Sequence, residues 1–250
     1  MRIGRRTLSK LRTAPSLFKH LRLSFAQYGE DFILPHLAPQ SRGFYVDVGA
    51  YQPRSKSNTY KLYLNGWSGI TIEPNPDVAK SFRKIRPRDT HLTLGVSSSP
   101  SELTYYKFEE ANFNSFFPEW QKERGLKVLA KVPVQCVTLT DILDQHCRNR
   151  RIDLLSVDCE GYDRQVLESL DWDGYRPTVV IIEDFAYFRT GGQPEAAAAM
   201  RSFMLDRDYA LASQTVFSCF YVDRLGFGPS DRNEGFRLDR SQLTTLALHQ

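Results

Sequence analysis

Short apolar runs alternate with helix-forming segments along most of this chain, and this alternation limits the possible folds more than any other feature. Residues 44–48 and 68–72 are rich in β-branched and aromatic side chains, and Gly49 and Glu73 follow them directly. Such runs are typical of buried strands. Helices between consecutive strands imply parallel βαβ units with right-handed crossovers. The pattern therefore predicts an α/β protein with a doubly wound, mostly parallel sheet.

The remaining elements are predicted from the same patterns. Further strands are expected at 91–96, 132–137, 152–157 and 178–182, with an edge strand or hairpin arm at 103–108. Helices are expected after Ser57, after Asn75-Pro76, and over 140–149, 163–170 and 195–206, with Ser57, Asn75 and Thr140 as N-caps. Segments 209–213 and 216–222 are predicted to form a closing antiparallel pair. The irregular, aromatic stretch 109–131 suits either a lid over a pocket or a packed surface excursion.

The formal net charge of +4 belongs to the start of the chain. The sequence holds 33 Lys and Arg against 29 Asp and Glu, but residues 1–24 contain seven basic residues and no acidic one. The rest therefore has 33 − 7 = 26 basic residues against 29 acidic ones, a charge of −3. We expect a basic extension at 1–23 followed by one domain at 24–250. A nucleic-acid-binding body is not expected, because such a fold spreads basic residues over one face.

The basic extension has two open interpretations. Four leucines (8, 11, 17 and 21) make a loose amphipathic pattern with the basic residues, interrupted at Pro15. The segment either contacts an anionic membrane peripherally or serves as a mobile solubilising arm. No signal-peptide core and no apolar run of spanning length is found. The four cysteines also lack disulfide or zinc spacing. We expect a cytoplasmic protein, with the extension as the only possible membrane contact.

Acidic residues follow several of the predicted strands. In an open α/β sheet, ligands bind at the carboxyl ends of the strands, so these residues mark the expected site. Carboxylates gathered at one edge repel one another unless they bind something. Neither GxGxxG nor GxxxxGK[ST] occurs, which argues against a dinucleotide and a P-loop nucleotide. A ligand with hydroxyls and positive charge fits this edge better than one dominated by phosphate. The strand-end residues are Asp47, Gly49, Glu73, Ser97, Asp158, Glu160, Glu183 and Asp184.

Several motifs follow one another over roughly residues 24–185. They are Ser24–Asp31, Phe44–Ala50, Ser57-Asn58-Thr59, Gly66–Ile70, Ile72–Asn75, Arg86-Pro87, Leu154–Gly161 and the strand ending at Glu183. Together they resemble the FkbM family of S-adenosylmethionine-dependent methyltransferases. The resemblance implies a Rossmann-like class I methyltransferase fold, whose seven-stranded sheet has an antiparallel last strand. It is specific for the family but not for a substrate.

The resemblance also implies roles for individual residues. Asp47, Gly49 and Ala50 would line the methionine end of the cofactor, and Glu73 with Pro74 would hold the ribose hydroxyls. Ser97 would lie at the adenine edge, and Asp158 near the transferred methyl group. The turn after Asp47 departs from the general DxGxGxG pattern, because Tyr51 and Pro53 stand where further glycines might occur. The backbone contacts of that turn therefore stay open.

Methyl transfer is an in-line displacement, so the protein must position both reactants and remove the acceptor proton. We expect O-methylation of a hydroxyl, with Asp158 as the leading general base and Glu160 and Glu183 as second choices. Mg²⁺ is a possible cofactor, because Asp158, Glu183 and Asp184 would offer hard oxygen ligands. The five histidines show no paired spacing.

The acceptor cannot be read from the sequence pattern. Family membership suggests a sugar hydroxyl in a glycan, glycolipid or glycosylated natural product, as in polysaccharide biosynthesis. The aromatic stretch 113–120 could stack on a sugar ring. Two alternatives remain: a non-catalytic Rossmann-like binding module, and an NAD-dependent oxidoreductase, which the missing GxGxxG disfavours.

Overall fold

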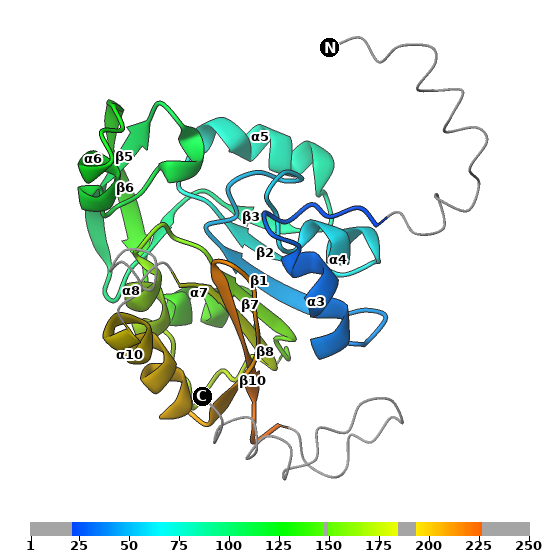
Figure 1. The fold of residues 1–250 in the computed structure, drawn as a ribbon. Helices are drawn as coiled ribbons and strands as arrows, with labels where there is room; N and C mark the ends of the chain where they lie inside the picture. Colours follow the sequence, from blue (N-terminus) through cyan, green and yellow to red (C-terminus); the bar gives the residue numbers. More distant parts are fainter. Residues whose placement is uncertain (1–21, 148–149, 185–193, 227–250) are drawn as a thin grey trace, which may run out of the picture.

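A central sheet organises the structure (Figure 1). The computed structural model describes residues 22–147, 150–184 and 194–226. Seven strands form the sheet in the order β3-β2-β1-β7-β8-β10-β9. All neighbours pair in parallel except β10, which is antiparallel to both β8 and β9. The strands are β1 (Phe44–Val48), β2 (Ser68–Ile72), β3 (Thr90–Leu92), β7 (Leu154–Val157), β8 (Val179–Glu183), β9 (Tyr209–Gln214) and β10 (Ser218–Asp223). The expected doubly wound sheet with an antiparallel last strand is confirmed.

Alternate residues of β1 face the two sides of the sheet, and helices cover both. Phe44, Val46 and Val48 pack with apolar residues of α7 (Leu139–His146), α8 (Asp163–Glu168) and α10 (Pro194–Leu205). Tyr45 packs on the opposite side, with residues of α3 (Glu30–Leu37) and α4 (Tyr60–Leu64). Every residue of β1 is buried, as expected for a central strand covered on both faces. Two layers of helices around one sheet therefore make the domain.

The predicted strand at 91–96 is wrong as a single element. Residues 90–92 form β3 in the main sheet, whereas β4 (Gly95–Val96) belongs to a separate three-stranded sheet of order β4-β6-β5. Close packing explains the change of sheet: a Cβ on Gly95 would lie 2.5 Å from the Cys136 sulfur and 2.7 Å from the Phe116 ring. Only glycine lets the chain approach β6 this closely.

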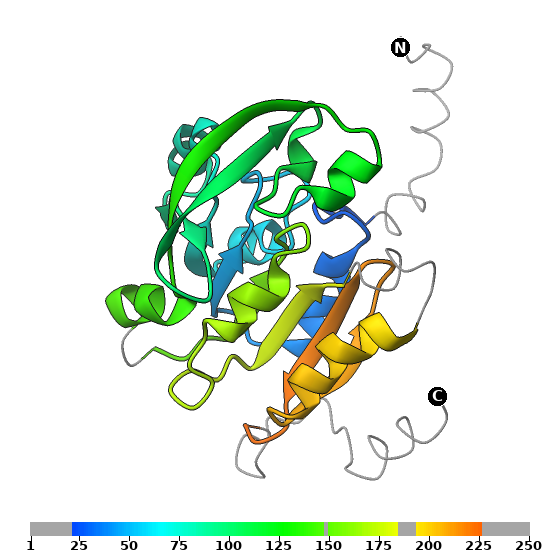
Figure 2. The same cartoon turned by 90° about the vertical axis from the view of Figure 1, so that its left-hand side faces the viewer.

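The other two strands of the small sheet form a long hairpin beyond the main sheet (Figure 2). They are β5 (Ser101–Phe108) and β6 (Val128–Val137), paired antiparallel. Of the two interpretations of 103–108, the hairpin arm is confirmed. The hairpin connection, inside the predicted irregular stretch, holds the 3₁₀ helix η1 (Ala111–Phe113) and α6 (Glu119–Glu123).

Helix starts agree with the sequence in one case and differ in two. Asn75 caps α5 (Pro76–Ile85), accepting a hydrogen bond from the Asp77 amide. Thr138, not Thr140, caps α7, and it forms a reciprocal capping box with Asp141. Thr59 is the residue before α4, although the Ser57 hydroxyl accepts from the Tyr60 amide. Several small polar residues precede each of these three helices. The sequence therefore predicted where the helices lie more accurately than it predicted their N-cap residues.

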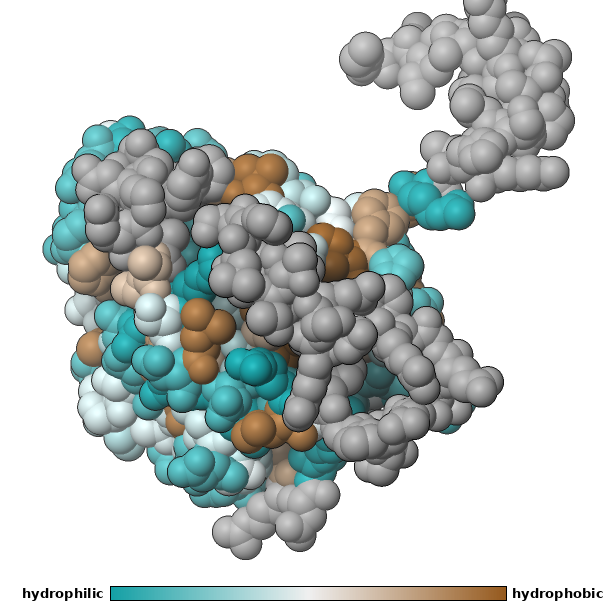
Figure 3. Space-filling view, turned by 60° about the horizontal axis from the view of Figure 1, so that its bottom comes forward, coloured by the Kyte–Doolittle hydropathy of each residue, from teal (hydrophilic) through white to brown (hydrophobic). Residues whose placement is uncertain are grey.

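Among the coloured, described residues of Figure 3, hydrophobic residues form scattered patches between hydrophilic ones. Among the described residues, no helix is long and apolar enough to cross a membrane. The predicted basic extension at 1–23 lies almost entirely outside the described residues, as do residues 227–250 of the predicted domain.

Candidate functional site

Strand register aligns four strand ends at one edge of the sheet. Val48 of β1 pairs with Ile72 of β2 and with Val157 of β7, and Val157 pairs with Ile182 of β8. The next residues in these strands are therefore neighbours along the edge. They are Glu73, Gly49, Asp158 and Glu183. The sequence prediction of acidic residues gathered at one edge is confirmed by the pairing.

A cavity that opens to solvent lies at this edge. Gly49, Glu73, Pro74, Asp158 and Glu160 of the predicted site line the cavity. Lining residues for which the sequence analysis predicted no role in the cavity include Gln27, Lys56, Tyr105 and Tyr162. Asn114–Phe116, near η1, also line the cavity and belong to the aromatic stretch predicted as a possible contact for a sugar ring. Part of the stretch predicted as a possible lid thus contributes a wall.

Gly49 occupies a position that other residues would obstruct. Its φ is +77°, and a Cβ there would lie 1.8 Å from the Asp158 carbonyl oxygen. The amides of Gly49 and Ala50 both donate to the Ile72 carbonyl, at 2.9 and 3.0 Å. Ala50 is buried and holds the turn rather than lining the cavity. The turn therefore brings bare backbone to the cavity edge, as close ligand approach requires.

Glu73 is buried at the cavity wall with both carboxylate oxygens in hydrogen bonds. Oε1 accepts from the Asn75 amide at 2.8 Å and from the Tyr105 hydroxyl at 3.2 Å, and Oε2 accepts from the Tyr51 amide at 3.0 Å. Burial raises the pKa of Glu73 to about 7, although these hydrogen bonds favour its charged form. Oε2 keeps room for a further donor, because a carboxylate has about four acceptor sites.

Asp47 points away from the cavity and into a buried polar network. Its Oδ2 accepts from the Thr59 hydroxyl at 2.5 Å. The guanidinium of Arg86, 1% exposed, donates to Thr59 Oγ1 at 2.8 Å and to the Tyr45 hydroxyl at 2.9 Å, and pairs with Asp89 at 2.7 Å. Asp47 is absent from the cavity lining. The structure therefore places the Asp47 side chain in this network, where it anchors the start of the glycine turn, and its role at the methionine end of the cofactor stays a prediction.

Ser97 is likewise buried beside the cavity rather than in its wall. Its hydroxyl shares a hydrogen bond of 3.2 Å with the hydroxyl of Tyr162, which does line the cavity. Ser97 therefore reaches the cavity only through Tyr162, and its place at the adenine edge stays a prediction. Tyr162 gave no sequence signal beyond its place after Gly161.

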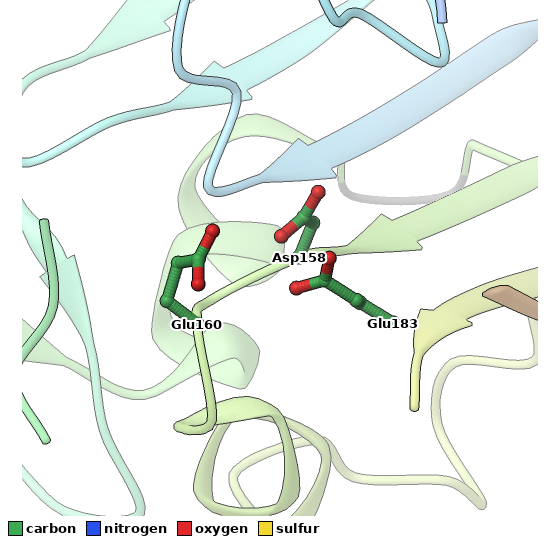
Figure 4. A group of neighbouring side chains, drawn as sticks. All are labelled: Asp158, Glu160 and Glu183. Carbon is green, nitrogen blue, oxygen red and sulfur yellow. The ribbon is translucent and has the colours of Figure 1, made fainter. Parts of the chain in front are cut away.

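The carboxylates of Asp158, Glu160 and Glu183 lie close together at this edge of the sheet (Figure 4), and the first two line the cavity. One oxygen from each of Asp158, Glu160 and Glu183 lies within 4.8 Å of the others. Asp184, predicted as a metal ligand with Asp158 and Glu183, is not in this group, and Glu160 takes its place. Glu160 adopts a left-handed φ of +53°, which is costly for a residue with a side chain. Such a conformation persists only where surrounding contacts hold it.

Asp158 and Glu183 share a hydrogen bond between their carboxyl groups. Burial raises the pKa of both, and the Asp158 charge raises the pKa of Glu183 further. The shared hydrogen bond lowers the pKa of Asp158 and raises that of Glu183, so Asp158 is the more acidic group of the two. The second Glu183 oxygen, Oε2, is buried without a hydrogen-bond partner among the described residues. Asp158 is therefore the carboxylate best placed to accept a proton.

Asp163 stabilises the loop that carries these acids. Its carboxylate accepts from the amides of Cys159 and Gly161, at 2.9 and 3.1 Å. Burial, followed by the charge of Asp158, raises the pKa of Asp163 to about 7. An acidic residue two positions after a glycine, at the start of a helix, was the sequence signal for this role.

A family model described as the methyltransferase FkbM domain matches residues 47–211, about two thirds of the 250-residue chain. A comparison with curated proteins gave no match. Among solved structures, an O-methyltransferase from Bacillus cereus in complex with SAH is 13% identical, with a TM-score of 0.42, and 88% of this chain and 92% of that one are covered. TomG from Streptomyces achromogenes, an O-methyltransferase of tomaymycin synthesis in complex with SAM, is 14% identical, with a TM-score of 0.42 and coverage of 88% and 91%.

Proposed function

The chain belongs to the FkbM family of S-adenosylmethionine-dependent methyltransferases, and we propose that it methylates a hydroxyl of a sugar in a glycan, glycolipid or glycosylated natural product. The observation that carries the hydroxyl assignment is the position of Asp158 in the cavity wall, where its carboxyl group shares a hydrogen bond with Glu183. The oxidoreductase alternative is set aside by the family assignment. Aromatic side chains in the cavity wall support a sugar, because sugar rings stack on them; they are Tyr51, Tyr105, Phe116 and Tyr162.

The cavity fits the chemistry of S-adenosylmethionine. The cofactor has a sulfonium, an ammonium, a carboxylate and a ribose diol, and no phosphate. Three acids, Glu73, Asp158 and Glu160, and one cation, Lys56, are among the lining residues. Glu73 would accept from the ribose hydroxyls through its remaining acceptor sites, and the bare backbone at Gly49 would admit the methionine end. Asp47 would act through the turn rather than by contact.

When bound, the cofactor supplies the methyl group from a positively charged sulfur. Asp158 would accept the proton of the acceptor hydroxyl while the oxygen–carbon bond forms and the sulfur–carbon bond breaks. A raised pKa suits this task, because a general base works best when its pKa approaches the working pH. Glu183 holds Asp158 in place through their shared hydrogen bond, and Glu160 extends the negative rim toward the acceptor.

The Asp158→Asn variant tests the assignment of the base. We expect turnover to fall about 10²–10⁴-fold, the usual contribution of general acid–base catalysis, while cofactor still binds. Cofactor binding is measured by calorimetry with S-adenosylhomocysteine, and turnover by transfer of a labelled methyl group to a panel of glycans. Full turnover in this variant would remove Asp158 from the mechanism. Lack of methyl transfer to every glycan, with cofactor bound, would favour the non-catalytic binding module instead.

A second form of the proposal places a divalent cation at Asp158, Glu160 and Glu183. The convergence of one oxygen from each supports it, as does the buried Glu183 Oε2 without a described partner. Mg²⁺ prefers hard oxygen ligands of this kind. The cation would polarise the acceptor hydroxyl and release its proton more easily.

Chelation separates the two forms. The cation form predicts that turnover is lost in EDTA and restored by Mg²⁺, and that Mn²⁺ binds to the purified protein by electron paramagnetic resonance. Glu183→Gln should weaken Mn²⁺ binding at least tenfold, by analogy with the cost of losing a metal-supporting group. Asp184→Asn is the matched control and should bind Mn²⁺ normally. Turnover that EDTA does not change would contradict the cation and support the version of the proposal without a metal.

A further inference from the structure

A second hollow adjoins the cavity and differs from it in charge. Its two walls are residues 24–27, ahead of α3, and residues 54–56, in the loop ahead of α4. The hollow opens widely to solvent. Gln27 and Lys56 line both this groove and the cofactor cavity, so the two spaces meet at these residues. A molecule lying in the groove could therefore extend one end into the cavity.

The groove walls are fixed by buried partners. Asp31, 1% exposed, accepts from the Ser24 hydroxyl at 2.7 Å and from the Phe25 amide at 2.8 Å. The Phe25 carbonyl accepts from the Ser57 amide at 2.9 Å, which ties the two walls together. Lys56 has a left-handed φ of +53°. Backbone strain of this kind is often stored at functional sites.

The charge of the lining changes sign between the two spaces. The groove is lined by Arg54 and Lys56 and by no acidic residue, whereas Glu73, Asp158 and Glu160 line the cavity. Both cations are exposed, and neither forms an ion pair with another described residue. The described contact of Lys56 is with the Tyr51 ring, 6.0 Å from its centroid. Lys56 also faces the acids of the cavity, where its charge lowers the pKa of Asp158, whereas Arg54 lines only the groove. Exposed cations beside a groove that has no acidic lining residue attract an anion.

We infer that the groove binds the acceptor through an anionic group on a sugar, a carboxylate or a phosphate, while the hydroxyl to be methylated reaches the acidic cavity. Arg54 suits either anion, because its planar guanidinium can donate two parallel hydrogen bonds. Lys56, at the junction, would separate the anion from the cavity acids. The inference rests on the proposed function and narrows its substrate class to acidic sugars.

Binding of simple sugars to the full chain tests the inference. With S-adenosylhomocysteine bound, the affinities of glucuronic acid, glucose 1-phosphate and glucose are compared by saturation-transfer NMR. We expect at least one acidic sugar to bind about tenfold more tightly than glucose, the gain from one charge-assisted hydrogen bond. A preference for glucuronic acid identifies a carboxylate as the anion, and a preference for glucose 1-phosphate identifies a phosphate.

Variants connect that preference to the groove. Arg54→Gln and the double variant Arg54→Gln/Lys56→Gln should bind the acidic sugars no better than glucose. Arg83→Gln, which removes an exposed charge from α5, is the matched control and should keep the preference. Equal or absent binding of the acidic sugars, or a preference that survives in the double variant, overturns the inference. Failure of S-adenosylhomocysteine to bind would instead contradict the proposed function.

Discussion

Glu73 shows how burial can make cofactor affinity depend on pH. Its pKa is raised to about 7, so the side chain is largely protonated at pH 6 and ionised at pH 8. The ionised form accepts hydrogen bonds from ribose hydroxyls at more positions than the neutral form does. We expect the affinity for S-adenosylhomocysteine to rise between pH 6 and pH 8, measured by calorimetry. Glu73→Gln should bind weakly at both pH values, and wild-type affinity that does not change would contradict this role for Glu73.

The raised pKa values of Asp163 and Glu73 predict that the stability of the protein falls as the pH rises, whereas its affinity for the cofactor product is expected to rise. Each has a folded-state pKa of about 7, above its ordinary value of 3.8 or 4.5. The folded state therefore binds more protons between these limits, and the free energy of unfolding falls as the pH rises through this window. The slope is about 1.4 kcal/mol per pH unit for each group while only the folded state is protonated. Urea unfolding at pH 5, 6, 7 and 8 should show this decline, and Asp163→Asn should reduce its slope. An unchanged slope in that variant would exclude Asp163 as a contributor.

Arg86 is predicted to be essential for stability rather than for chemistry. It is buried beside Asp89 and, through Thr59, compensates Asp47. Arg86→Met would leave Asp89 and Asp47 without the cation that compensates them. Breaking a buried ion pair in this way lowers the free energy of unfolding by about 3–5 kcal/mol. Urea unfolding measures the loss. Arg83→Met, on the exposed side of the same helix, should change stability little, and a similarly small effect at Arg86 would contradict the network.

The direction of the Asp47 side chain could not be predicted from the sequence. The strand end was predictable from the apolar run and the glycine turn that follows. However, all five residues of β1 are buried, so the usual alternation of apolar and polar residues does not reveal which face each side chain takes. Sequence spacing also does not reveal the bonds of Arg86 to Thr59 and Tyr45, which lie 27 and 41 positions away.

At the scale of elements, the turn between β1 and α4 depends on one glycine. Gly49→Ala would place a Cβ against the Asp158 carbonyl, in a left-handed conformation. Gly66 is the matched control, because its φ is +94° but nothing lies within 4 Å of its Cβ position. Gly66→Ala should cost only the conformational strain of about 1–2 kcal/mol. Gly49→Ala should lower the free energy of unfolding, measured in urea, clearly more than Gly66→Ala does, and it should abolish binding of S-adenosylhomocysteine. Equal effects of the two substitutions would contradict this role for Gly49.

Most elements were predictable because hydrophobic runs and turn residues are local signals. The division of 91–96 between two sheets was not, because it depends on how closely Gly95 approaches Cys136, 41 positions later. The cap at Thr138 was missed for a different reason: Thr138 and Thr140 are both good N-caps by residue type, and only the reciprocal bond with Asp141 distinguishes them.

At the scale of the whole molecule, topology followed from general rules. Right-handed crossovers and the position of ligands at strand ends apply to any doubly wound sheet, so they predicted the edge where the cavity lies. The charge reversal between the cavity and the adjoining groove was hidden, since Lys56 and Asp158 are about a hundred positions apart and meet only in the fold. The overall net charge does not show this reversal either, because it sums the charges of the cavity, the groove and the basic extension.

The positive charge of the basic extension predicts that the protein binds anionic membranes. Residues 1–24 carry seven basic residues and no acidic one, and each basic residue near an anionic surface contributes about 1 kcal/mol. We therefore expect the full chain to co-sediment with phosphatidylserine-containing vesicles at low salt, and to be released as salt screens the attraction. Phosphatidylcholine vesicles are the control for the lipid, and a chain lacking residues 1–22 is the control for the segment. Equal sedimentation of the two chains would show that the segment is a solubilising arm, and that a lipid-linked acceptor must be recognised by the domain itself.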